Sequence, residues 1–285
     1  MTARLLALVA ALLAALPAFA ATEIPDGGMP PVDDTGALYR SVTIVTGTRI
    51  ETRLPGFAET LGDVLVKVTG DQTIRADRSL GRAARDAQAL VLRFSYRDRL
   101  KGKPVHDEQG THDRPHFLTV DFDPAKVVAL AVTLGRKPWP LPRPHVLLLV
   151  AVENIHNAFV LTRDGAIDRS DDMRFAVNAA AAKAALPPAV LPSGADIAAR
   201  GWSVKTLDAV KAADAEALAK ADGAQAAVAG HIVFSEKALG WIVRWRMAYG
   251  GKSYVWSTRG VNFDAAFRHA LAGAAQVMAG RGAPR

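Results

Sequence analysis

Residues 138–144 read Pro-Trp-Pro-Leu-Pro-Arg-Pro, and this alternation constrains the fold more than any other stretch of the chain. Each proline fixes its own φ angle and lacks a backbone N–H, so neither a helix nor a central strand can continue through the segment. Alternating prolines instead favour a stiff, extended connector. The sequence therefore predicts two domains, at residues 38–142 and 143–281.

The first half alternates between strand-like and helix-like patterns. The predicted strands, rich in β-branched or alternating apolar residues, are 39–46, 91–97 and 117–122. The predicted helices are 57–68, 77–90 and 124–134. Asp123 followed by Pro124 is a strong start signal for the last of these, because aspartate caps free N–H groups and proline fits the first helical position.

The second half repeats this mixture of elements. The predicted strands are 146–152, 226–234, 242–249 and 253–258, the last two joined by a turn at Gly250-Gly251. The predicted helices are an alanine-rich one capped by Asp171 and Asp172, then 207–221 and 264–279. Both halves favour the α+β class: two small α/β sandwich domains with mostly antiparallel sheets and helices packed on one face.

The first 20 residues have the pattern of a secretory signal peptide. Arg4 precedes an apolar run at 5–16, and Ala18-Phe19-Ala20 fits the small-x-small cleavage rule. We expect cleavage after Ala20, with residues 21–37 as a flexible spacer rich in proline and glycine. No later apolar run is long enough to cross a membrane, so the mature chain is expected in the bacterial periplasm without a transmembrane segment.

Composition narrows the classes of function. The chain has no cysteine, which excludes disulfides, a cysteine nucleophile, cysteine-ligated zinc and iron–sulfur clusters. Its formal net charge of +7 favours an anionic partner, such as an envelope protein or an anionic envelope polymer. Nucleic acid is not an expected partner of an exported protein. No cofactor is expected either.

The hairpin near the C-terminus is the strongest candidate for a binding surface. Strand alternation places Arg244 and Arg246 on one face, with Arg259 on the neighbouring strand. Exposed arginine near an aromatic residue, here Trp256, is a common recognition surface. The alternative is ordinary strand alternation with solvated arginines.

The segment 106–116 is the candidate for a metal site. It contains His106, His112 and His116 together with Asp107 and Asp113, and imidazole and carboxylate are suitable zinc ligands. The spacing matches no established metal motif, and a solvated loop is the alternative. No nucleophile elbow or other catalytic signature is visible.

Several short motifs resemble the family called domain of unknown function 2066. They are the segments 62–71, 94–96, 118–123 and 138–145, followed by Gly240-Trp241, Trp245, Gly251, Trp256 and Gly260. The resemblance extends over residues 38–280 and implies an exported bacterial envelope protein, with no catalytic residue to transfer. We therefore expect a non-enzymatic binding or accessory module of the periplasm. The alternative is a metal-dependent hydrolase that uses the loop 106–116.

Overall fold

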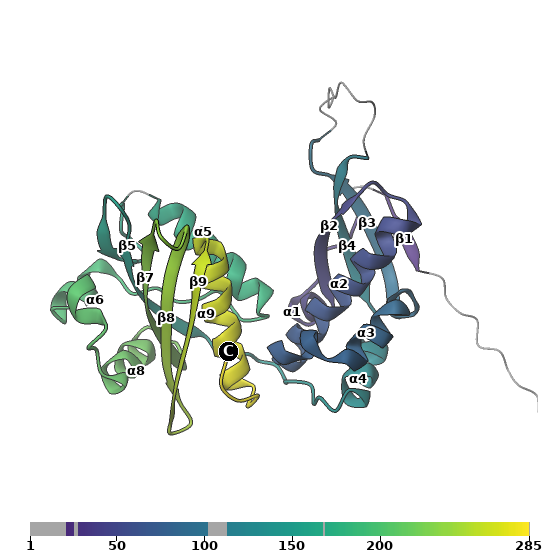
Figure 1. Ribbon diagram of the computed structural model, residues 1–285. Helices are drawn as coiled ribbons and strands as arrows, with labels where there is room; N and C mark the ends of the chain where they lie inside the picture. The colour runs from purple at the N-terminus through teal and green to yellow at the C-terminus, as the bar shows by residue number, and fades with distance from the viewer. Residues whose placement is uncertain (1–20, 26–27, 102–112, 168, 285) are drawn as a thin grey trace, which may run out of the picture.

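The computed structural model describes residues 21–25, 28–101, 113–167 and 169–284, which fold around two β-sheets (Figure 1). Both sheets are mixed but mostly antiparallel, with helices packed against them, which confirms the predicted α+β class. One sheet is formed before the proline connector and the other after it. Because contacts described below join the two halves, the domain limits at residues 142 and 143 stay a prediction.

The first sheet has the strand order β1-β3-β4-β2, and only β1 and β3 are parallel. Its strands are β1 (Thr22–Ile24), β2 (Arg40–Thr46), β3 (Val91–Asp98) and β4 (Pro115–Phe122). Its helices are α1 (Asp34–Leu38), α2 (Ile50–Thr69), α3 (Arg78–Arg85) and α4 (Pro124–Thr133), with 3₁₀ turns η1 (Gln72–Ala76) and η2 (Ala87–Leu90). Helices cover one face, as predicted, while Val42 and Ile44 on the opposite face are 46% and 50% exposed.

The second sheet has the strand order β6-β5-β7-β8-β9, and only β5 and β7 are parallel. Its strands are β5 (Val146–Glu153), β6 (Ala158–Val160), β7 (Ala226–Ser235), β8 (Gly240–Tyr249) and β9 (Lys252–Val261). Its helices are α5 (Ser170–Lys183), α6 (Gly194–Ala199), α7 (Val204–Leu207), α8 (Ala212–Ala221) and α9 (Phe263–Met278). The hairpin of β8 and β9 turns at Gly250 and Gly251, which both have positive φ angles, as predicted.

Helices cover both faces of the second sheet, so the expectation of a single covered face is wrong for this half. Leu148 and Val150 of β5 lie in a cluster with α5 and α9, whereas Leu147 and Leu149 lie in a second cluster with α6, α7 and α8. A strand that is apolar at consecutive positions, as β5 is before Glu153, needs cover on both sides. The smaller helices do not extend over the outer face of β8 and β9, where Ile242 is 43% exposed and Val255 is 52% exposed.

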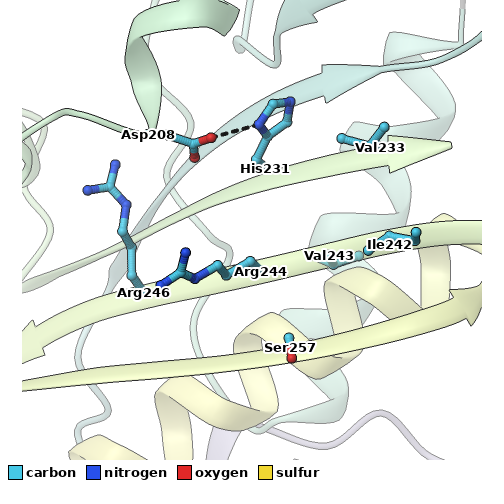
Figure 2. A pocket seen from close by; sticks show the side chains of 8 residues that line it. All are labelled: Asp208, His231, Val233, Ile242, Val243, Arg244, Arg246 and Ser257. Atoms are coloured by element: carbon cyan, nitrogen blue, oxygen red, sulfur yellow. Dashed lines mark hydrogen bonds and ion pairs between the residues drawn. The ribbon is translucent and has the colours of Figure 1, made fainter. Parts of the chain in front are cut away.

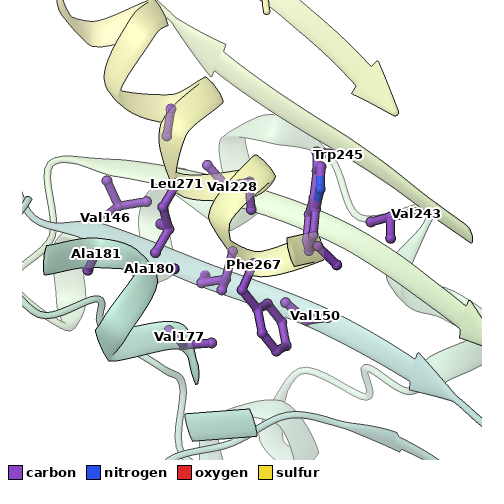
Figure 3. Packing of buried hydrophobic residues seen from close by; sticks show 14 of the residues in the cluster. Val146, Val150, Val177, Ala180, Ala181, Val228, Val243, Trp245, Phe267 and Leu271 are labelled. Atoms are coloured by element: carbon purple, nitrogen blue, oxygen red, sulfur yellow. The ribbon is translucent and has the colours of Figure 1, made fainter. Parts of the chain in front are cut away.

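The main core of the second half lies between the sheet and the helices α5 and α9 (Figure 3). Trp245 is fully buried there, with its ring centroid 6.5 Å from that of Phe267 on α9. Gly230 of β7 is paired with Trp245, and a Cβ atom at Gly230 would lie 2.0 Å from the indole ring. Only glycine leaves room for the indole at this position.

The connector contacts the end of α2 in the first half. The backbone N–H of Trp139 donates to the carbonyl of Val68 at 2.8 Å, and the guanidinium of Arg143 donates to the carbonyl of Lys67 at 3.0 Å. Arg143 also stacks over the Trp139 ring. These carbonyls have no partner within the helix, so the connector supplies the hydrogen bonds that the helix end lacks.

Near the N-terminus the structure differs from the prediction in two places. Residues 21–37 were expected to form a flexible spacer, but β1 pairs with β3 and α1 is capped by Asp33. The helix α2 starts at Ile50 rather than 57, and Pro55 lies inside it. The neighbouring Gly56 is buried against Leu118 and Val45, so tertiary contacts keep this turn helical despite the proline.

Three predicted helices also differ in their limits. The helix expected at 77–90 is divided into α3 and η2, and the one expected at 207–221 is divided into α7 and α8. Asp171 and Asp172 lie in the first turn of α5, whose N-cap is Arg169, so they are not the caps. Asp123, in contrast, accepts hydrogen bonds from the N–H groups of Ala125 and Lys126, which confirms its capping role.

Candidate functional site

The open part of the second sheet carries a pocket of about 410 Å³ on its outer face (Figure 2). Cross-strand pairing joins His231 of β7 to Arg244 of β8, and Arg244 to Ser257 of β9, and we call these three residues the polar row. The next pair on the same face of these strands, Val233 and Ile242, forms the apolar row. Same-face positions on a strand are about 7 Å apart, so a polar and an apolar surface adjoin within one pocket.

His231 is held from both sides by carboxylates. Its Nδ1 lies 2.9 Å from a carboxylate oxygen of Asp208, which follows α7, and its Nε2 lies 3.1 Å from one of Glu153 at the end of β5. An ionised carboxylate can only accept a hydrogen bond, so a ring nitrogen that carries a proton donates it to the carboxylate it faces. The ring is thereby fixed against the sheet, at one side of the pocket.

Arg246 is anchored to the backbone between α7 and α8. Its guanidinium donates to the carbonyl of Val210 at 2.6 Å and to the carbonyl of Leu207. These carbonyls lie where the helix predicted at 207–221 is interrupted, and Arg246 supplies their hydrogen-bond donors. Burial lowers the pKa of the Arg246 guanidinium, the nearby Asp208 raises it and Arg244 lowers it. Arg246 therefore positions the helices and adds positive charge to one wall of the pocket.

Arg244 has a different environment. Its side chain is exposed and lines the pocket beside Arg246, as Figure 2 shows. Within the part of the chain that the structure describes, no carboxylate forms an ion pair with Arg244. A guanidinium offers five N–H donors, so this residue brings unused donors and a positive charge into the pocket.

The structure separates the four partner-binding residues expected from the sequence. Arg244 and Arg246 line one pocket, whereas Arg259 is exposed on the same face but outside the pocket. Trp256 is only 3% exposed, and its indole N–H donates to the carbonyl of His269 on α9. Its expected place in the binding surface is wrong, because Trp256 points into the core on the opposite face of the sheet.

The proposed metal loop lies mostly outside the described residues, which include neither His106 nor His112 and omit Asp107. His116 is in β4, with its Nδ1 2.8 Å from the carbonyl of Arg114, and Asp113 pairs with Arg49. In the described ranges, no group of three His, Cys, Asp or Glu residues is arranged to hold a metal ion. The three-histidine site therefore stays an untested hypothesis.

Sequence reasoning missed His231, Asp208 and Glu153. His231 is the only titratable residue within the largely apolar strand β7, a pattern that usually indicates a core position. Asp208 and Glu153 lie 23 and 78 residues from it along the chain, and nothing in the local sequence connects them. The fold alone brings the three together.

Comparison with known proteins assigns part of the first half to a family model. Residues 34–140 match the Domain of unknown function (DUF8605), a range that runs from α1 into the proline connector. The expected membership of the family called domain of unknown function 2066 is therefore wrong. No curated protein matches the chain, and no solved structure does. The match over 34–140 leaves the second sheet and its pocket outside the family model.

Proposed function

We propose that this protein is a non-enzymatic binding module of the bacterial periplasm that holds an anionic ligand or partner in the Arg244 pocket. The observation that carries the proposal is the guanidinium of Arg244, which has no ion-pair partner among the described residues and lines a cavity of about 410 Å³. A cavity of this size suits a small ligand or one end of a larger partner. The exported location is inferred from the signal-peptide pattern of the first 20 residues.

The arrangement around His231 supports binding rather than catalysis. A general base needs a free lone pair within reach of the substrate. Both ring nitrogens of His231 face carboxylate oxygens instead. The ring is thus held in place as part of the pocket wall, next to the two arginines.

Anion binding at Arg244 can be tested directly by nuclear magnetic resonance. The mature chain is titrated with sodium acetate and with inorganic phosphate, and the side-chain Nε–H signals of arginine are followed. We expect a saturable shift at Arg244 and no comparable shift at Arg268, an exposed arginine on α9 that serves as the matched control. Arg244→Gln should abolish the saturable response, whereas Arg268→Gln should leave it intact. Equal, unsaturable shifts at both arginines would contradict the proposal.

The alternative function, a metal-dependent hydrolase that uses the loop 106–116, has no support from the contacts of the described residues. The described neighbours of the loop, Asp113 and His116, already have partners in Arg49 and the carbonyl of Arg114. Binding of an anion is the function that the described residues support best. The first half of the chain, which contains the residues that match the family model, would then be the second part of the same binding module.

A further inference from the structure

The charge of the pocket wall indicates how many negative charges a ligand should carry. Arg244 and Arg246 contribute two positive charges, and Asp208 contributes one negative charge. His231 lies between the carboxylates of Asp208 and Glu153. One positive charge remains uncompensated, and this favours a monoanion over a multiply charged phosphate, whose extra charge would face Asp208.

The geometry of the pocket favours a particular shape of monoanion. The polar row offers the Arg244 guanidinium and the Ser257 hydroxyl, donors that suit the two oxygens of a carboxylate. The apolar row is the next pair on the same face, where Ile242 is 43% exposed beside Val233. A ligand with a carboxylate and an adjoining apolar group of about 7 Å would cover both rows.

We propose, building on the anion-binding function above, that the pocket binds a monocarboxylate attached to an apolar group. The carboxylate accepts from Arg244 and Ser257, and the apolar group covers Val233 and Ile242. Two sources share this chemistry: a free medium-chain fatty acid, and the C-terminus of a peptide that ends in an apolar residue. Nothing in the pocket requires a metal or a cofactor for such binding.

The test compares defined ligands on the mature chain by isothermal titration calorimetry. Hexanoate has four more methylene groups than acetate, and their burial predicts at least about tenfold tighter binding. Hexylamine carries the opposite charge and should not bind. An acetylated dipeptide that ends in leucine is compared with its C-terminal amide, and loss of the carboxylate should weaken binding about tenfold or more.

Matched variants assign the binding to the two rows. Arg244→Gln should weaken hexanoate binding about tenfold or more, because it removes a charged hydrogen bond. Ile242→Asn changes an exposed residue and should lower the affinity for hexanoate to that for acetate, while leaving acetate binding unchanged. Arg268→Gln is the control and should behave as the wild type. Each variant is first shown to unfold at the wild-type urea midpoint.

Each outcome distinguishes this inference from the function on which it rests. If acetate or phosphate binds at Arg244 as tightly as hexanoate, the apolar row makes no contribution and the inference is overturned, but the anion pocket remains. If no anion responds to Arg244→Gln, both proposals are wrong. Binding of hexanoate without the peptide supports a free acid as the source. Binding of the peptide acid but not its amide supports a C-terminus.

Discussion

Arg281, near the C-terminus, donates from its Nε to the backbone carbonyl of Thr69 at a distance of 3.0 Å, across 212 residues of sequence. Thr69 is the last residue of α2, whose C-cap is Gly70 in the left-handed conformation. Arg281 also donates to the carbonyl of Lys137, the residue just before the connector. One side chain therefore joins the end of the chain, the connector and the first half.

Removal of this side chain should weaken the junction between the halves. Arg281→Ala leaves the partly buried carbonyl of Thr69 without its donor, and we expect a loss of about 1–3 kcal/mol in the free energy of unfolding. Urea denaturation measures the loss, with Arg268→Ala as the control at an exposed arginine of α9. An unchanged urea midpoint for Arg281→Ala would show that the contact does not contribute to stability.

Two glycines should respond in opposite ways to the same substitution. Gly230→Ala places a methyl group against the Trp245 indole and should destabilise the protein by roughly 1–3 kcal/mol or more. Gly62→Ala lies inside α2, where the added Cβ would meet its nearest neighbour, a Leu80 methyl, at 3.9 Å. It should stabilise the protein by roughly 0.5–1 kcal/mol, because alanine loses less backbone entropy in a helix. Thermal unfolding of both variants measures the contrast, and equal effects would contradict the proposed cause.

Lys67 should give the protein a specific dependence on pH. Burial lowers the pKa of its ammonium group from 10.5, the neighbouring Asp63 raises it, and Lys183 lowers it again. The unfolded chain therefore binds this proton more tightly than the folded chain does. The contribution of Lys67 to the free energy of unfolding should consequently rise as the pH rises from its pKa in the folded protein towards 10.5.

The difference between wild type and Lys67→Met isolates this contribution, because other titrating groups cancel. We expect the wild type to gain stability relative to the variant as the pH approaches 10.5, measured by urea denaturation at several pH values. The exposed Lys237→Met, which removes the same positive charge from the surface, serves as the control. If the difference in unfolding free energy between the wild type and Lys67→Met does not change with pH, burial of Lys67 does not lower its pKa.

The proposed export of the protein predicts a processed N-terminus. After expression in a bacterial host, the osmotic-shock fraction should contain a chain that begins at Ala21, because Ala18-Phe19-Ala20 fits the cleavage rule. Intact-mass spectrometry of the purified protein determines this end. Replacing Ala20 with a bulky residue, as in Ala20→Phe, should leave the precursor unprocessed. A full-length wild-type chain in the cytoplasmic fraction would contradict the proposed periplasmic location.

Sequence patterns located most of the regular elements because their signals are local. The alternation in β8 and β9, the two glycines of their turn and the cap at Asp123 depend on neighbours in the chain. The apolar run in β5 also indicated burial, but not that helices would cover both faces of its sheet. In the described part of the chain, no helix is long and apolar enough to span a membrane.

The elements that the prediction misplaced depend on contacts between distant residues. The helix expected at 207–221 is interrupted where Arg246 binds the carbonyls of Leu207 and Val210. In the same way, β1 lies in a segment without a strand signal and is held by its pairing with β3. Local propensity describes neither case, because a side chain or strand from elsewhere supplies the hydrogen bonds.

The sequence by itself determined the α+β class, the proline connector and the face of β8 that carries Arg244. Only the tertiary structure decided that Trp256 is buried while Arg244 lines a pocket with His231 and Asp208. Alternation along a strand assigns residues to two faces without showing which parts of a face the helices cover. The covered area depends on where α7 and α8 lie on the sheet. Hydrogen bonds to Arg246 on β8 and to His231 on β7 hold the segment between these helices in place.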